Sequence, residues 1–107
     1  MITIEEFRKV ELKIAEIKEV NDHPNADRLY VVTIDAGEGV TRQVVAGIKG
    51  SYAKEELVGK QVVVVTNLAP ALLRGVESNG MILAASDESG IRIIMPERKG
   101  TLGSIVK

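Results

Sequence analysis

The chain has 107 residues, of which 14 are basic and 15 acidic, with one histidine and no cysteine. This length fits one domain with one modest core. The lack of cysteine excludes disulfides, thiolate metal sites and cysteine catalysis, and the near-neutral charge excludes a general polycation. No apolar run approaches the roughly 20 residues that cross a bilayer, and no signal-peptide pattern opens the chain, so we expect a cytoplasmic protein with no membrane partner.

The first predicted elements are a short helix and a long strand. Thr3 stands three residues before Glu6, the spacing of a capping box, which predicts a helix start. Over residues 10–20 apolar and charged residues alternate and then change phase, which predicts a strand bent by a bulge near residues 15–16. Residues 13–20 also fit helical spacing, so a helix stays an alternative there.

A turn is predicted next, in the segment HPNADRL at residues 23–29. Pro24 fixes its own backbone and favours an extended residue before it. Asn25 and Asp27 can accept hydrogen bonds from amides two residues further on, so we expect an Asx-type turn that enters a strand. Arg28 is the one residue here whose charge could reach a phosphate.

The middle of the chain predicts a hairpin, a short helix and a buried strand. RLYVVTIDAG at 28–37 and VTRQVVAG at 40–47 are strand-like runs separated by glycines, as a hairpin requires. SYAKEELVGK at 51–60 predicts a helix, with Ser51 as its N-cap and Gly59 at its end. QVVVVTN is an apolar run without alternation, typical of a strand covered on both faces.

The last part predicts a long loop and several short strands. Residues 67–81 are fifteen residues without a regular pattern, which is long for a connector in a small domain. The further short strands are MILAAS, GIRIIMP and LGSIV, at 81–86, 90–96 and 102–106.

This order of elements predicts an all-β domain with short helices, a five-stranded Greek-key barrel of the OB type with a helix between the third and fourth strands. We place the barrel at about residues 1–86 and a small β-rich C-terminal extension at about 87–107. No strand alternates with a full crossover helix, so a doubly wound parallel sheet is not expected.

Candidate binding residues lie in the loop and among the basic residues of the middle. Acidic residues concentrate before residue 39 and basic ones after it, so any anion-binding face should be local. Loops at this end of an OB barrel bind oligonucleotides. The candidates are Arg28, Arg42, Lys49 and Lys54 by charge, and Asn67, Arg74, Ser78, Asn79 and Met81 in the loop.

Other site chemistries have little support in the sequence. His23 has no cysteine or second histidine as a co-ligand, so we expect no metal. The acidic pairs at 5–6 and 55–56 lie in first helical turns, where carboxylates complement the helix dipole, so we expect no catalytic residue and no cofactor. Only three aromatic residues are present, which argues against stacking of single-stranded bases and favours folded RNA read by shape.

Several blocks of the sequence together resemble the tRNA-binding domain family. That family includes stand-alone structure-specific tRNA-binding proteins, the C-terminal domains of many methionyl-tRNA synthetases, and the C-terminal part of synthetase cofactors related to the cytokine EMAP II. The blocks, in order, are FRKVELKIAEI, HPNADRLYVVTIDAG, RQVVAGI, EELVGKQVVVVTNLAP and RGVESNGMILAAS.

The resemblance implies an OB fold that binds the tRNA elbow by shape and performs no amino-acid activation itself. It implies a homodimer and a methionyl-tRNA synthetase catalytic region as partner, in cis or in trans. In the family the C-terminal segment contributes to the dimer interface, which here would use Ile93, Ile94, Met95, Leu102 and Ile105.

At the residue level, the family's serine and methionine of the loop correspond to Ser78 and Met81, which are implicated there in tRNA contact. The chain has Ala69 and Leu72 where many relatives have lysine. Two phosphate-reaching charges are therefore absent, and two alternatives stay open: a homodimerisation module with weak RNA affinity, and a chaperone-like relative of the same fold.

Overall fold

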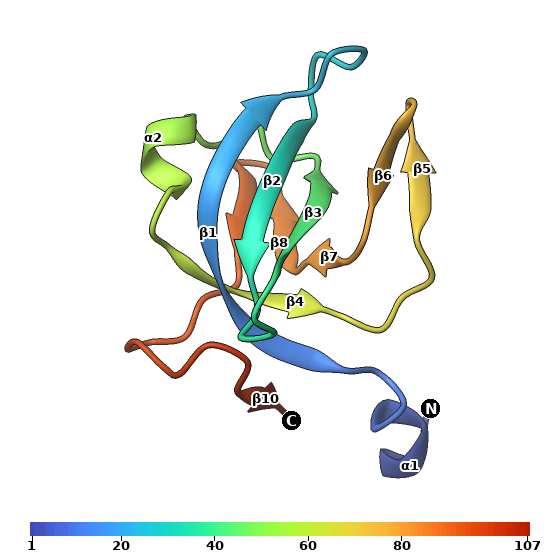
Figure 1. Cartoon of the computed structure of the whole chain (residues 1–107). Coiled ribbons are helices and arrows are strands. Elements are labelled where there is room, and N and C mark those ends of the chain that lie inside the picture. The colour runs from blue at the N-terminus through green and yellow to red at the C-terminus, as the bar shows by residue number, and fades with distance from the viewer.

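Five antiparallel strands wrap into a nearly closed barrel, in the spatial order β3, β2, β1, β4, β7 (Figure 1). The computed structural model describes all residues from 1 to 107. The predicted all-β class, with a five-stranded barrel and short helices, is confirmed. The barrel strands are β1 (Leu12–Asp22), β2 (Tyr30–Asp35), β3 (Thr41–Ala46), β4 (Gln61–Val65) and β7 (Met81–Ile82).

The long strand β1 bends so that it serves two parts of the barrel. Its first half pairs with β4 and its second half pairs with β2. The register shifts between Ile17 and Glu19, so the bulge lies later than the predicted position at 15–16. The prediction of a long strand with a bulge is confirmed, but the bulge was placed too early: Ile14 and Ala15 are both buried, in two different clusters, so the apolar alternation ends before the bulge. The alternative helix at 13–20 is excluded.

Strand β4 separates two apolar clusters. Val62 and Val64 point into the main core of fifteen buried residues, whereas Val63 and Val65 belong to a second cluster with Leu12. All five residues of β4 are buried, which confirms the prediction of a strand covered on both faces. Partly buried side chains cover the second cluster, from Phe7, Leu83, Leu102 and Val106.

The two helices are short. Helix α1 (Ile4–Phe7) starts with the predicted capping box, because Thr3 and Glu6 bond reciprocally. Helix α2 (Lys54–Leu57) carries the fully buried Leu57 into the core. Ser51 is not its N-cap: the helix starts at Lys54, and the Ser51 hydroxyl accepts a hydrogen bond from the amide of Ile91 at 3.0 Å.

The predicted loop at 67–81 contains a two-stranded hairpin that projects from the barrel, β5 (Ala71–Leu73) and β6 (Val76–Ser78) (Figure 1). Its turn residues, Arg74 and Gly75, have φ of 52° and 89°. Positive φ at both central residues is the requirement of a type I′ turn, which sequences usually meet with Asn-Gly or Asp-Gly. The expectation of an irregular loop was wrong because Arg-Gly does not carry that usual signal.

The C-terminal segment adds a second small hairpin and a strand beside the start of β1. These elements are β8 (Ala84–Asp87), β9 (Gly90–Ile93) and β10 (Ile105–Val106), and β10 pairs with Leu12 and Lys13. The C-terminus therefore lies on the same lower side of the barrel as the N-terminal helix (Figure 1). None of the helices has the length and apolar character to cross a membrane.

Candidate nucleic-acid interface

The turn at residues 23–29 and the tip of the β5–β6 hairpin are in direct contact, although about fifty residues separate them. His23 is buried, with 6% of its surface exposed. Its Nδ1 accepts a hydrogen bond from the amide of Asn25 at 2.9 Å, and its Nε2 lies 2.9 Å from the carbonyl oxygen of Leu73. Because a carbonyl only accepts, Nε2 carries the proton and donates.

This contact corrects the prediction for the turn. An Asx turn would use the side chains of Asn25 and Asp27 as acceptors for nearby amides. The acceptor inside the turn is instead the His23 ring. The Asn25 side-chain amide donates across to the Arg74 carbonyl at 3.4 Å, and Arg74 Nη2 donates to the Asn25 carbonyl at 3.1 Å.

Two arginines line the surface at this junction. A surface hollow of about 460 Å³ is lined by the turn and by Arg74, with Arg28 at its side. Neither arginine has an ion pair within 4.0 Å. Guanidinium groups bind phosphate through paired N–H donors. The lining is completed by Asn25, Ala26, Asp27 and Leu29.

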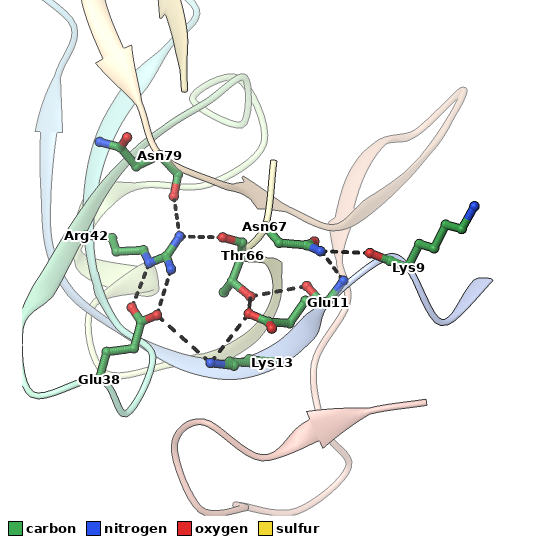
Figure 2. Close-up of polar contacts among 8 residues, drawn as sticks. All are labelled: Lys9, Glu11, Lys13, Glu38, Arg42, Thr66, Asn67 and Asn79. Atoms are coloured by element: carbon green, nitrogen blue, oxygen red, sulfur yellow. Dashed lines mark hydrogen bonds and ion pairs between the residues drawn. The ribbon is translucent and has the colours of Figure 1, made fainter. Parts of the chain in front are cut away.

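The base of the hairpin is held by Arg42 (Figure 2). Its guanidinium donates to the carbonyl of Thr66 at 2.7 Å and to that of Asn79 at 3.1 Å, on the two sides of the hairpin excursion. The Glu38 carboxylate accepts its other two bonds, at 2.6 and 2.7 Å. These bonds raise the pKa of Arg42 and lower that of Glu38. Arg42 is thus engaged within the protein.

Asn67 fixes the entry to the hairpin in the same network (Figure 2). Its side chain accepts from the amide of Glu11 at 2.8 Å and donates to the carbonyl of Lys9 at 2.7 Å. The Glu11 carboxylate accepts from the Thr66 hydroxyl, which lowers the pKa of Glu11 despite partial desolvation. Lys13 lies between the carboxylates of Glu11 and Glu38, at 3.5 and 4.0 Å.

Ser78 and Met81, the residues suggested by the family, face different surroundings. Ser78 is 4% exposed, and its hydroxyl accepts from the amide of Val45 at 2.9 Å and donates to the carbonyl of Gly80 at 3.1 Å. It therefore joins the hairpin to the edge of β3. Met81 is 47% exposed and lines an apolar hollow of about 280 Å³ with Leu68, Ala69, Ala71 and Leu73 among others.

Lys49 and Lys54 both bond Asp22, at the end of β1 beside the turn. Their amino groups lie 3.0 and 2.9 Å from its carboxylate oxygens. The hydrogen bond from Lys54, followed by that from Lys49, lowers the pKa of Asp22, and Asp22 raises the pKa of Lys54. All three side chains are about a third to a half exposed, so the pair stays open to an external phosphate.

The predicted contact residues thus divide by surroundings. Arg28, Arg74 and Met81 present accessible groups around the turn and the hairpin. Ser78 and Arg42 hold that hairpin in place from within, as does the Asn79 main chain, whereas the exposed Asn67 side chain fixes the entry to the hairpin. Sequence reasoning missed His23 and Asn25, for which a lone histidine before proline in a polar turn was the only signal.

The predicted dimer residues also divide. Ile93 is buried in the main core, and Leu102 packs on the second cluster. Ile94, Met95 and Ile105 remain exposed, Ile105 by 58%. These three are the members of the predicted set that could contact another molecule.

The barrel, with its helix before β4 and its hairpin excursion after it, defines a domain of the OB class. Residues 12–104 match the family described as "Putative tRNA binding domain", and the chain belongs to this family. The predicted resemblance is confirmed.

Relatives of known identity give the same family. The chain is 51% identical over 106 residues to the methionine–tRNA ligases of Thermococcus kodakarensis and Pyrococcus furiosus. The match covers 99% of this chain but only 14% of each ligase. Among solved structures, the MetRS related protein from Pyrococcus horikoshii superposes with a TM-score of 0.91 at 30% identity, covering 100% of this chain and 98% of that one. The CsaA chaperone protein from Picrophilus torridus gives 0.93 at 28%, with full coverage of both.

Proposed function

We propose that this chain is a non-catalytic, structure-specific tRNA-binding domain that raises the tRNA affinity of a methionyl-tRNA synthetase, in cis or in trans. The observation that carries the proposal is the junction of turn and hairpin, where Arg28 and Arg74 line one hollow together with Asp27 and neither arginine forms an ion pair. Family membership and the ligase relatives support the choice of tRNA.

The mode of recognition follows from what the surface offers. Tyr30 is buried, Tyr52 packs against the main core, and Phe7 packs against the second cluster. No aromatic ring is therefore fully exposed, which disfavours stacking of unpaired bases. Contacts from guanidinium groups to phosphate oxygens fix position without reading sequence. The domain would accordingly recognise the shape of folded tRNA at its elbow.

The hairpin is suited to reading shape because both of its ends are fixed. Arg42 and Asn67 hold its base, and the His23 turn holds its tip. A two-stranded hairpin alone is only marginally stable in water. These contacts present Arg74 in one orientation, which reduces the entropy lost when RNA binds.

We also propose that two copies associate through the C-terminal segment. Its residues Ile94, Met95 and Ile105 are exposed, and Leu102 and Val106 of the same segment give the second cluster only partly buried cover. Apolar side chains of this kind gain free energy when a second copy removes them from water. A dimer would place two hairpins on one particle and raise the effective concentration of tRNA at a catalytic body.

A chaperone-like role is the second candidate. It is favoured by two apolar hollows of about 240 and 280 Å³ that share Val45 and Met81, and by the likeness to a CsaA chaperone protein. An apolar peptide segment could occupy this surface. In that case an unfolded client would compete with tRNA only weakly, because Arg28 and Arg74 line a different hollow, beside the turn at residues 23–29.

The deciding experiment compares folded tRNA with single-stranded RNA of equal length in filter binding. We expect a clear preference for folded tRNA over the single strand, and a tRNA affinity that falls as the salt concentration rises. Equal affinity for the two RNAs would remove shape recognition. If the protein suppresses the aggregation of an unfolded client, and added tRNA does not abolish this suppression, the chaperone role would be favoured. Light scattering with and without tRNA reports dimerisation in the same samples.

A further inference from the structure

We propose that His23 is a positioning residue for tRNA binding: by bonding the hairpin tip to the turn, it aims the Arg74 guanidinium into the hollow beside Arg28. This inference rests on the proposed function. His23 itself is buried and touches no RNA. It acts through the position of Arg74.

The bond from His23 to Leu73 is partly buried, and it is the contact to the hairpin tip that a buried side chain makes. The two bonds between Asn25 and Arg74 are exposed and longer, at 3.1 and 3.4 Å. Strand β5 has no buried residue, so packing does little to fix the tip. The 2.9 Å bond from the imidazole therefore sets where the tip lies.

The backbone conformation of Arg74 requires contacts that keep the hairpin tip in place. Its φ of 52° lies in the left-handed region, which a residue with a Cβ adopts at a cost. Such a conformation persists only where surrounding contacts determine it. If the tip were released from the turn, the Arg74 backbone could relax and its side chain would lose its direction.

A histidine is suited to this position because one of its ring nitrogens accepts a hydrogen bond and the other donates one. Nδ1 accepts from the Asn25 amide and shapes the turn, whereas Nε2 donates to Leu73 and attaches the hairpin. A substitution can retain either one of these two hydrogen bonds without the other. Asparagine places its amide near the position of Nδ1, and glutamine places its amide near that of Nε2. His23→Asn thus retains the turn contact, and His23→Gln retains the hairpin contact.

The test measures tRNA affinity in a double-mutant cycle with Arg74→Gln. We expect His23→Asn to weaken binding by about threefold to tenfold, the effect of one lost hydrogen bond, and His23→Gln to keep most of the affinity. In the Arg74→Gln background, neither change should reduce binding further, because the group that His23 positions is gone.

Three outcomes would overturn the inference. The first is an equal loss from His23→Asn with and without Arg74, which would indicate a general structural role. The second is better binding by His23→Asn than by His23→Gln, which would make the turn the important element. The third is a wild-type chain without preference for tRNA, which would refute the proposed function as well; the first two leave that function intact. Thermal unfolding of each variant shows that the compared proteins are folded.

Discussion

Removing the charges of Arg28 and Arg74 is the sharpest perturbation of the proposed interface. Arg28→Gln with Arg74→Gln keeps a polar side chain with a hydrogen-bond donor at each position but removes both cations from the hollow. Neither arginine takes part in an ion pair, so no carboxylate is left unpaired. The fold should be retained, and the change in RNA binding should report lost phosphate contacts.

The expected size follows from counterion release. Each phosphate contact contributes about −0.9 to the slope of log affinity against log salt, or about −0.7 for single strands. With about four contacts, a rise from 50 to 200 mM salt reduces affinity by about 150-fold, and with about two contacts by about 12-fold. We therefore expect the double variant to have a slope smaller by about 1.4 to 1.8.

The assay is tRNA binding over that salt range, with a control of equal charge change. Arg92→Gln with Arg98→Gln removes two exposed arginines outside the hairpin junction, which bond only to the adjacent Ile91 carbonyl and the adjacent Glu97. The control should keep the wild-type slope. Equal slopes for wild type and the junction variant, or an equal loss in the control, would refute the reasoning.

Three further predictions concern the barrel and the dimer. Ser78→Ala leaves the buried amide of Val45 without its acceptor, so chemical denaturation should show a loss of about 1–3 kcal/mol in the free energy of unfolding; no loss would contradict the role of Ser78 in joining the hairpin to β3. The bonds from Arg42 hold the pKa of Glu38 below its ordinary 4.5, so the stability that this pair contributes is fully present above that pH and lost as the pH falls through the lower folded-state pKa. Glu38→Gln should make the acid decline of stability less steep, and an unchanged decline would rule the pair out. Ile105→Asp should shift the chain from dimer to monomer in light scattering without unfolding it, whereas an unchanged mass would place the interface elsewhere.

The barrel was predictable because its determinants are local. The unbroken apolar run of β4 indicates burial on both faces, and the Thr3–Glu6 spacing indicates a helix start. The bulge in β1 was less accessible, because the sequence around it contributes to two clusters at once. The hairpin at the Arg74–Gly75 turn was missed because Arg-Gly is not a usual type I′ sequence, and because its tip bonds to a turn about fifty residues away.

The candidate site shows the same division. Its region and its arginines could be found from charge and loop length. Sequence alone gives the same charge to Arg42, whose guanidinium is engaged by Glu38 and two carbonyls, and to Arg74, whose guanidinium forms no ion pair. Which arginine is available to RNA is decided by tertiary contacts. The sequence treats the HPNADRL turn and the hairpin as separate segments, whereas in the structure hydrogen bonds join them.

The central claim is that the turn and the hairpin form the tRNA-binding surface. Its most direct test is an NMR titration of folded tRNA into isotope-labelled protein, in which shifts of the backbone amide signals are measured. We expect the largest changes at residues 23–29 and 73–81, the turn and the hairpin. Changes confined to other surfaces, such as the exposed basic residues at 98–99, with the turn and hairpin signals unmoved, would contradict it.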